Sequence, residues 1–108
     1  IGDFKAGLKN GLGKLYLNNE LLYDGNFVND CKQGNGSLYN IETKKIVYKG
    51  NFINEMRDGY GILYFYNGLI CYKGFWTHNM SNGYGEEYNK NKELIYKGEW
   101  KYNNKINK

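Results

Sequence analysis

The stretch YKGNF at residues 48–52 decides the fold, because it has near-copies elsewhere in the chain. These are YDGNF at 23–27, YKGFW at 72–76 and YKGEW at 96–100. In each copy a Tyr, a Gly and a second aromatic residue alternate with residues that are mostly polar. Successive side chains of a β-strand point to opposite faces, so this alternation is typical of a strand with one aromatic and one polar face.

The recurrence extends along nearly the whole chain. An anchor glycine is followed, always nine positions later, by a Gly-x-Gly pair, whereas the distance from the pair to the next anchor varies between 14, 16, 15 and 15. A second Tyr follows each pair. The anchors are Gly2, Gly25, Gly50, Gly74 and Gly98, and the pairs are Gly11/Gly13, Gly34/Gly36, Gly59/Gly61 and Gly83/Gly85. A fixed internal repeat of this kind predicts a repeat architecture.

Each unit holds two short strands, so the sequence predicts an all-β, elongated, single-layer antiparallel β-meander with one hairpin per repeat. The connections between units contain NN at 18–19 and NG at 67–68, and NG is typical of hairpin turns. The six residues between the second aromatic residue and the Gly pair read as a loop. About nine strands at ~4.8 Å each predict a ribbon on the order of 40 Å long.

The anchor glycines Gly25, Gly50, Gly74 and Gly98 are expected to be structural. Glycine in the middle of a strand normally weakens it. Here it lacks a Cβ where an aromatic ring from the neighbouring strand can lie against the backbone, which would give a single sheet a dry layer. The alternative is that these glycines only mark bulges or turns, which suits the Gly-x-Gly pairs about as well.

The repeated columns resemble the MORN (membrane occupation and recognition nexus) repeat, whose pattern is Tyr-x-Gly-x-Trp followed by Gly-x-Gly. YKGFWTHNMSNGYGEEY and YKGNFINEMRDGYGILY carry the resemblance best. Phe replaces Trp in three units, and the residue before the Gly pair is Asn10, Gln33, Asp58 or Asn82 where the family often has His. We expect an array of four units plus the first strand of a fifth over 1–101, and an incomplete end of the fifth unit over 102–108.

The residue inventory gives no indication of an enzyme, a cofactor or a metal site. The only histidine, His78, falls in an expected loop and has no catalytic or metal-ligating set around it. The stretch from Gly7 to Gly13 lacks the spacing of a phosphate-binding loop. Cys31 and Cys71 are expected to lie about four strands apart, roughly 19 Å, which is too far for a disulfide. We expect no catalytic residues and no nucleic-acid binding.

The charge is concentrated near the end of the sequence. Residues 1–89 hold nine basic and nine acidic side chains, whereas residues 90–108 hold six Lys and two Glu. Lys49, Lys73 and Lys97 occupy one column on the polar face, and Lys101 follows nearby. This arrangement predicts contact with acidic lipid headgroups or with an acidic partner. The alternative is ordinary solvation together with protection of an edge strand by Lys.

The aromatic face is the stronger candidate site for a protein partner. A lone ribbon cannot cover both of its faces, so some rings are expected to stay accessible in a groove, unless packing between repeats uses them fully. The expected groove residues are Tyr23, Phe27, Tyr48, Phe52, Tyr72, Trp76, Tyr96 and Trp100.

The resemblance implies a non-catalytic interaction scaffold, expected to be a fragment of a larger protein. It would bind a peptide or helix in the aromatic groove, and its end strands, 1–5 and 94–101, leave self-association to a dimer open. One alternative is a module that associates with membranes through acidic phospholipids. Another is an accessory array of an enzyme, for example a lipid kinase, whose catalytic domain lies outside these residues. The expected location is cytoplasmic, at a membrane or a cytoskeletal structure.

Overall fold

The computed structural model describes residues 2–5 and 8–106, with side chains described from residue 9 onward. Residues 1, 6–7 and 107–108 of the expected array lie outside the described residues. The strands are β1 (Gly2–Lys5), β2 (Leu8–Leu17), β3 (Glu20–Val28), β4 (Cys31–Tyr39), β5 (Ile46–Ile53), β6 (Met56–Tyr64), β7 (Ile70–Thr77), β8 (Met80–Tyr88), β9 (Leu94–Lys101) and β10 (Asn104–Lys105).

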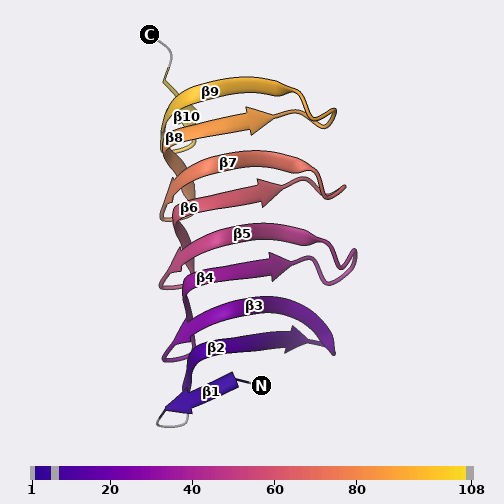
Figure 1. Ribbon diagram of the computed structural model, residues 1–108, viewed down its shortest axis with the longest axis vertical. Coiled ribbons are helices and arrows are strands. Elements are labelled where there is room, and N and C mark those ends of the chain that lie inside the picture. Colours follow the sequence, from indigo (N-terminus) through magenta and orange to yellow (C-terminus); the bar gives the residue numbers. More distant parts are fainter. Residues whose placement is uncertain (1, 6–7, 107–108) are drawn as a thin grey trace.

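All ten strands form one open antiparallel sheet in strict sequence order (Figure 1). The sheet is a single layer that rises as a ladder of hairpins, and its extents are 50 × 26 × 14 Å. The single-layer meander that the sequence predicts is therefore confirmed. The described residues contain no helix of the length and apolarity that crossing a membrane requires.

Tight turns connect the strands along one edge of the sheet. The edge on the left of Figure 1 has two-residue turns at Asn29–Asp30, Asn54–Glu55, His78–Asn79 and Tyr102–Asn103, and every one of these residues has a positive φ between 47° and 73°. Two positive φ values in succession are what a type I′ hairpin turn requires. The six-residue loops expected at 28–33, 53–58 and 77–82 are therefore wrong, because strands occupy all but two residues of each.

Glycines pair with glycines across the sheet and form one continuous row. Because each anchor glycine lies opposite the second glycine of the Gly-x-Gly pair on both neighbouring strands, the row crosses nine strands. Its members are Gly2, Gly13, Gly25, Gly36, Gly50, Gly61, Gly74, Gly85 and Gly98.

Tyrosine rings lie on this glycine row. A Cβ added to Gly61 would overlap the ring and hydroxyl of Tyr48, and a Cβ added to Gly50 would overlap the backbone of Gly61. The Tyr48 hydroxyl crosses the row and donates a hydrogen bond to the carbonyl of Asn51 at 3.0 Å. The same arrangement recurs with Tyr23 over Gly36 and with Tyr72 over Gly85.

The core is a string of eight rings stacked edge to face. Neighbouring rings have centroids 5.1–5.7 Å apart and planes at 79–89°. T-shaped pairs of this kind contribute about 0.5–1.5 kcal/mol each beyond the area they bury. In order along the sheet, the core rings are Phe27, Tyr23, Phe52, Tyr48, Trp76, Tyr72, Trp100 and Tyr96.

Candidate functional site

The core rings are the eight residues expected to line an accessible groove, and the structure places them differently. Seven of the eight are buried, with exposed fractions from 0% to 8%, and only Tyr96, the last ring of the string, is half-buried. The rings are buried because each one covers its neighbours on both sides. A partner therefore has little access to the faces of these rings.

Cations on the aromatic face cover the rings further. Lys9 lies 5.4 Å from the centroid of Phe27, and Lys32 lies 5.5 Å from that of Tyr23. Arg57 stacks 4.5 Å from the centroid of Trp76, and Lys105 lies over Tyr96 and Trp100. These cations stand two residues before the first three Gly-x-Gly pairs and before Asn107, which takes the place of a fifth pair, so the column is visible in the sequence. These Lys and Arg side chains cover the core through cation–π contacts and through the apolar parts of their chains.

The fourth unit departs from this pattern on the aromatic face. Ser81 takes the place of the cation, and it is buried with its Oγ 3.1 Å from Asn103 Oδ1. Glu87 takes the place that Leu38 and Leu63 hold in earlier units, and its Oε1 pairs with Lys105 Nζ at 2.8 Å. Both polar groups thus have partners within the chain.

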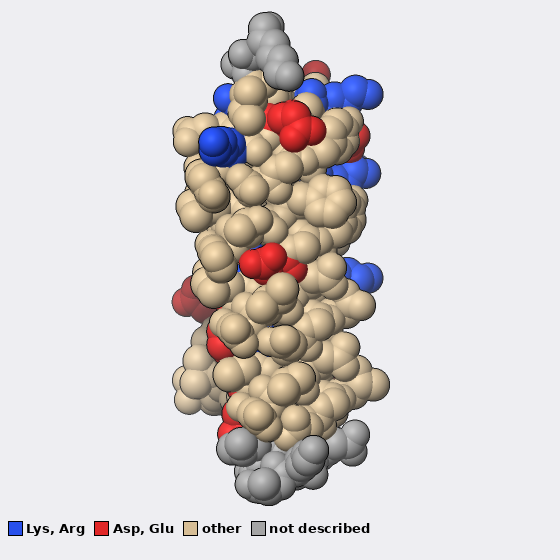
Figure 2. Space-filling model, turned by 90° about the vertical axis from the view of Figure 1, so that its left-hand side faces the viewer, with Lys and Arg blue, Asp and Glu red and all other residues tan. Residues whose placement is uncertain are grey.

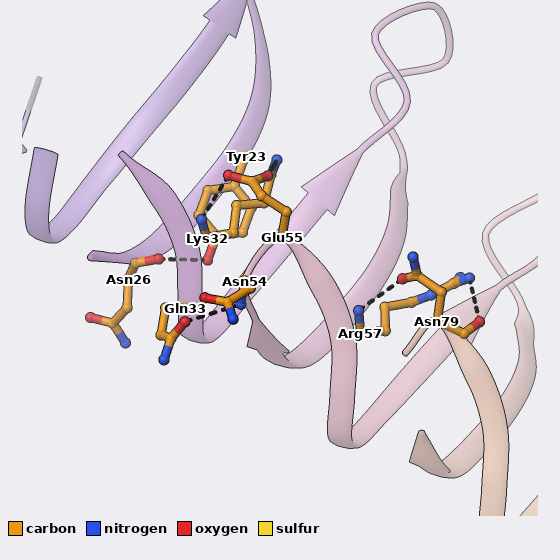
Figure 3. Close-up of polar contacts among 8 residues, drawn as sticks. All are labelled: Tyr23, Asn26, Lys32, Gln33, Asn54, Glu55, Arg57 and Asn79. Atoms are coloured by element: carbon orange, nitrogen blue, oxygen red, sulfur yellow. Dashed lines mark hydrogen bonds and ion pairs between the residues drawn. The ribbon is translucent and has the colours of Figure 1, made fainter. Parts of the chain in front are cut away.

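The two-residue turns clasp each repeat to the one before it (Figure 3). The backbone N–H of Arg57 donates to Asn79 Oδ1 at 2.8 Å, and the N–H of Asn79 donates to the Arg57 carbonyl at 3.0 Å. The same reciprocal bonds join Lys32 to Glu55, whose ion pair measures 2.7 Å. Similar bonds join Lys9 to Asp30 and Ser81 to Asn103.

A second column of side chains completes each clasp. Gln33 Oε1 accepts the N–H of Asn54 at 3.0 Å, and the equivalent acceptors in other units are Asn10, Asp58 and Asn82. This is the column where MORN repeats often have His. In this chain its side chains accept the hydrogen bonds that hold the next turn in place. Seen onto this edge, the surface carries scattered charged groups on a largely uncharged background (Figure 2). The clasp makes this edge structural.

The outward face, opposite the core rings, keeps a group of large side chains exposed. Tyr60, Phe75 and Tyr84 stand on the consecutive strands β6, β7 and β8 and are 45%, 47% and 44% exposed. Tyr60 and Phe75 are cross-strand partners with centroids 5.5 Å apart. These residues were not predicted as a site, because the polar face was inferred from units that carry Asp, Lys and Asn there. We call Tyr60, Phe75 and Tyr84 the outward patch.

A hollow of about 460 Å³ lies on β4, β5 and β6 and shares Tyr60 with the outward patch. The β6 side is apolar, with Tyr60, Ile62 and Tyr64 at alternate positions of the strand. The β5 side contributes Lys49 and Asn51. On the side opposite β6, the short side chains of β4, among them Ser37, form only a shallow wall.

The expected lysine column is a mixed row in the structure. Ile62 separates Lys49 from Lys73 in cross-strand register, and Glu86 separates Lys73 from Lys97. The Lys73 ammonium lies 3.8 Å from Glu86 Oε1, and Lys101, at the end of β9, is exposed. The column therefore does not form an uninterrupted basic strip.

The remaining expected sites are also placed by the structure. Cys31 and Cys71 are free thiols, and Cys31 begins β4 rather than lying in a loop. His78 is the first residue of a tight turn. Among the described residues, no three His, Cys, Asp or Glu side chains gather in a way that could hold a metal ion. The C-terminal edge differs from expectation, because β10 pairs with Trp100 and Lys101 of β9.

The ring-on-glycine joints, repeated without a second layer, define a single-layer β-repeat array. The sequence profile of the MORN repeat matches residues 1–20, 23–40, 48–70 and 72–92. The chain therefore belongs to the MORN-repeat family. No curated protein shows significant similarity to the chain.

Proposed function

We propose that this chain is a non-catalytic scaffold that binds a protein partner on the outward face of its sheet. One observation carries the proposal: Tyr60, Phe75 and Tyr84 remain nearly half exposed on adjacent strands, whereas the core rings are buried. Aromatic side chains bring much contact area with few torsions to immobilise, which suits them to protein interfaces. The burial of the core rings moves the proposed contact away from the aromatic groove.

The rigidity of the sheet supports a scaffold role. Each joint between repeats combines a ring on glycine with a clasp, so the outward patch stands on strands fixed from both sides. A surface held in one conformation loses little entropy when a partner binds to it. The array thus offers a preformed surface.

The test compares partner capture by two triple variants of the chain. One replaces the outward patch (Tyr60→Thr, Phe75→Thr and Tyr84→Thr), and the other replaces three exposed residues at the far end of the array (Leu12→Thr, Tyr16→Thr and Leu17→Thr). Thr keeps the strand propensity at each position. Each variant is fused to a proximity-labelling enzyme and expressed in the source cells. We expect the proteins labelled by the native fusion to be absent with the first variant and present with the second. Equal retention by both would contradict binding at the outward patch.

Acidic phospholipid is the alternative that the same material tests. Co-sedimentation with vesicles containing phosphatidylserine should leave the array in the supernatant at physiological salt, because the lysine row is interrupted by Ile62 and Glu86. Pelleting that Lys49→Glu and Lys97→Glu abolish would favour the membrane function over the scaffold.

A further inference from the structure

The hollow beside the outward patch differs from the equivalent places in the neighbouring repeats. In the next repeat Phe75 stands where Asn51 stands here, and Glu86 stands where Ile62 stands and lies 3.8 Å from Lys73. In the preceding repeat Asp24 takes the place of Lys49. The repeat of β5 and β6 therefore combines a cation, an apolar wall and unfilled space.

Three polar side chains at this hollow, those of Lys49, Asn35 and Asn51, have no partner within the described part of the chain. Lys49 takes part in none of the ion pairs of the described residues. The side-chain amides of Asn35 and Asn51 make no hydrogen bond there either, although their backbone carbonyls accept one each. An exposed ammonium and two amides thus face the solvent beside Tyr60, Ile62 and Tyr64.

The spacing of these groups matches an extended peptide. Alternate residues of β6 lie ~7 Å apart, which is also the distance between alternate side chains of an extended segment. A segment lying along β6 could place an apolar side chain against Ile62 and a carboxylate near Lys49, its cross-strand partner. The side-chain amides of Asn35 and Asn51 can bond to peptide groups, since each amide both donates and accepts.

From these observations we infer that the hollow binds an extended acidic peptide segment, with an apolar side chain against Tyr60, Ile62 and Tyr64 and a carboxylate on Lys49. This inference rests on the proposed function, because it names the chemistry of the partner segment on the same face. A lipid surface fits less well: it needs about 4–8 clustered basic residues, and a single unpaired cation faces this hollow.

Variants that copy neighbouring repeats can test the hollow without disturbing the fold. Asn51→Phe fills the space as Phe75 does in the next repeat, and Lys49→Asp reverses the charge as Asp24 does in the preceding one. Lys97→Asp is the matched control, because it changes the same column outside the hollow. Thermal unfolding followed by circular dichroism verifies that all three variants fold.

The experiment is selection of peptides from a random dodecamer phage library on the native chain. We expect selected peptides to pair an acidic residue with an apolar one two positions away. Their affinity, measured by fluorescence anisotropy with a synthetic selected peptide, should fall about tenfold or more for Lys49→Asp, which removes a charge-assisted contact, and for Asn51→Phe, which fills the hollow. The Lys97→Asp control should bind within about twofold of the native chain.

The alternative outcomes separate the inference from the proposed function. Peptides that lose affinity for the outward-patch variant but not for Lys49→Asp or Asn51→Phe would overturn the hollow and leave the scaffold standing. Peptides indifferent to all of these variants, or no selected peptides at all, would overturn the hollow, whereas the scaffold is decided by the partner-capture comparison of the two triple variants. Binding of phosphatidylserine vesicles without selected peptides would assign the face to a membrane.

Discussion

The two faces of this sheet use the same residue types in opposite ways. Tyr48 and Tyr60 both lie in the third unit, yet Tyr48 is fully buried on the aromatic face and Tyr60 is 45% exposed on the outward face. On the aromatic face the units repeat a Tyr and a second ring, Phe or Trp, at the same two positions, because each joint needs them. On the outward face the residues equivalent to Tyr60 are Leu12, Asn35 and Tyr84. Within one repeat array, constancy between units indicates packing, and variation indicates where function can differ.

The largest expected effect acts on several core rings at once. Burial raises the pKa of Tyr23 and of Tyr72 to about 12, and it raises the pKa of Tyr48 as well. The unfolded chain ionises these phenols near pH 10, so the stability they contribute is complete below that pH and is lost as the pH rises towards 12. We expect unfolding in this window, followed by circular dichroism and phenolate absorbance. Full phenolate absorbance with an intact sheet would contradict it.

A matched pair of substitutions compares the two faces directly. Tyr48→Ala should lower the free energy of unfolding by about 4 kcal/mol, because it removes a ring that contacts Phe52 and Trp76 and leaves a cavity. Tyr60→Ala should cost less than about 1 kcal/mol, since the side chain is exposed. Urea denaturation measures both. Similar losses at the two positions would show that the outward face also holds the fold together.

The glycine row supplies a smaller effect. Gly61→Ala should cost about 2–3 kcal/mol, because the new Cβ meets the ring of Tyr48. In a Tyr48→Ala background the same substitution should cost less than about 1 kcal/mol, which makes the pair strongly non-additive. Urea denaturation of the four proteins of this cycle gives the coupling. Additive losses would mean that the glycine serves the backbone and not the ring.

The clasp between repeats gives the smallest effect. Asn79→Gly keeps the positive φ but removes the acceptor for the Arg57 N–H, and should cost about 1 kcal/mol. Asn79→Asp keeps the acceptor, as Asp30 does in the first clasp, and should lie within about 0.5 kcal/mol of the native chain. Hydrogen exchange at the Arg57 amide should quicken in the first variant alone. If both variants exchange equally, the side chain does not hold the joint.

Much of the fold could be predicted from the sequence, because the residues that pack between repeats recur at the same positions in each unit. The alternation in residues 48–52 predicts the strand, and the phase between anchor glycines and Gly-x-Gly pairs predicts the hairpin. The tight turns were harder to predict. His78–Asn79 and Tyr102–Asn103 both adopt positive φ without any glycine, which no local signal requires.

The candidate site was less predictable, because exposure depends on what neighbouring strands contribute. The pattern predicts which face a ring occupies, but not that Arg57 stacks on Trp76 or that edge-to-face packing buries the string. Phe75 and Tyr84 could have been found by comparing units at the residue after the anchor glycine and at the middle residue of the Gly-x-Gly pair. The hollow needed the register, since Lys49, Asn35 and Ile62 come from three different strands.

The strict sequence order of the strands has a mechanical consequence. The first and last strands, β1 and β10, lie at opposite ends of the sheet, and every strand is joined only to its neighbours (Figure 1). A pull between the termini therefore separates the strands one hydrogen bond after another, and each repeat of about 24 residues extends from about 10 Å to about 80 Å. Loaded along its long axis, such an array opens at low force, because the hydrogen bonds between two strands break in succession and not all at once.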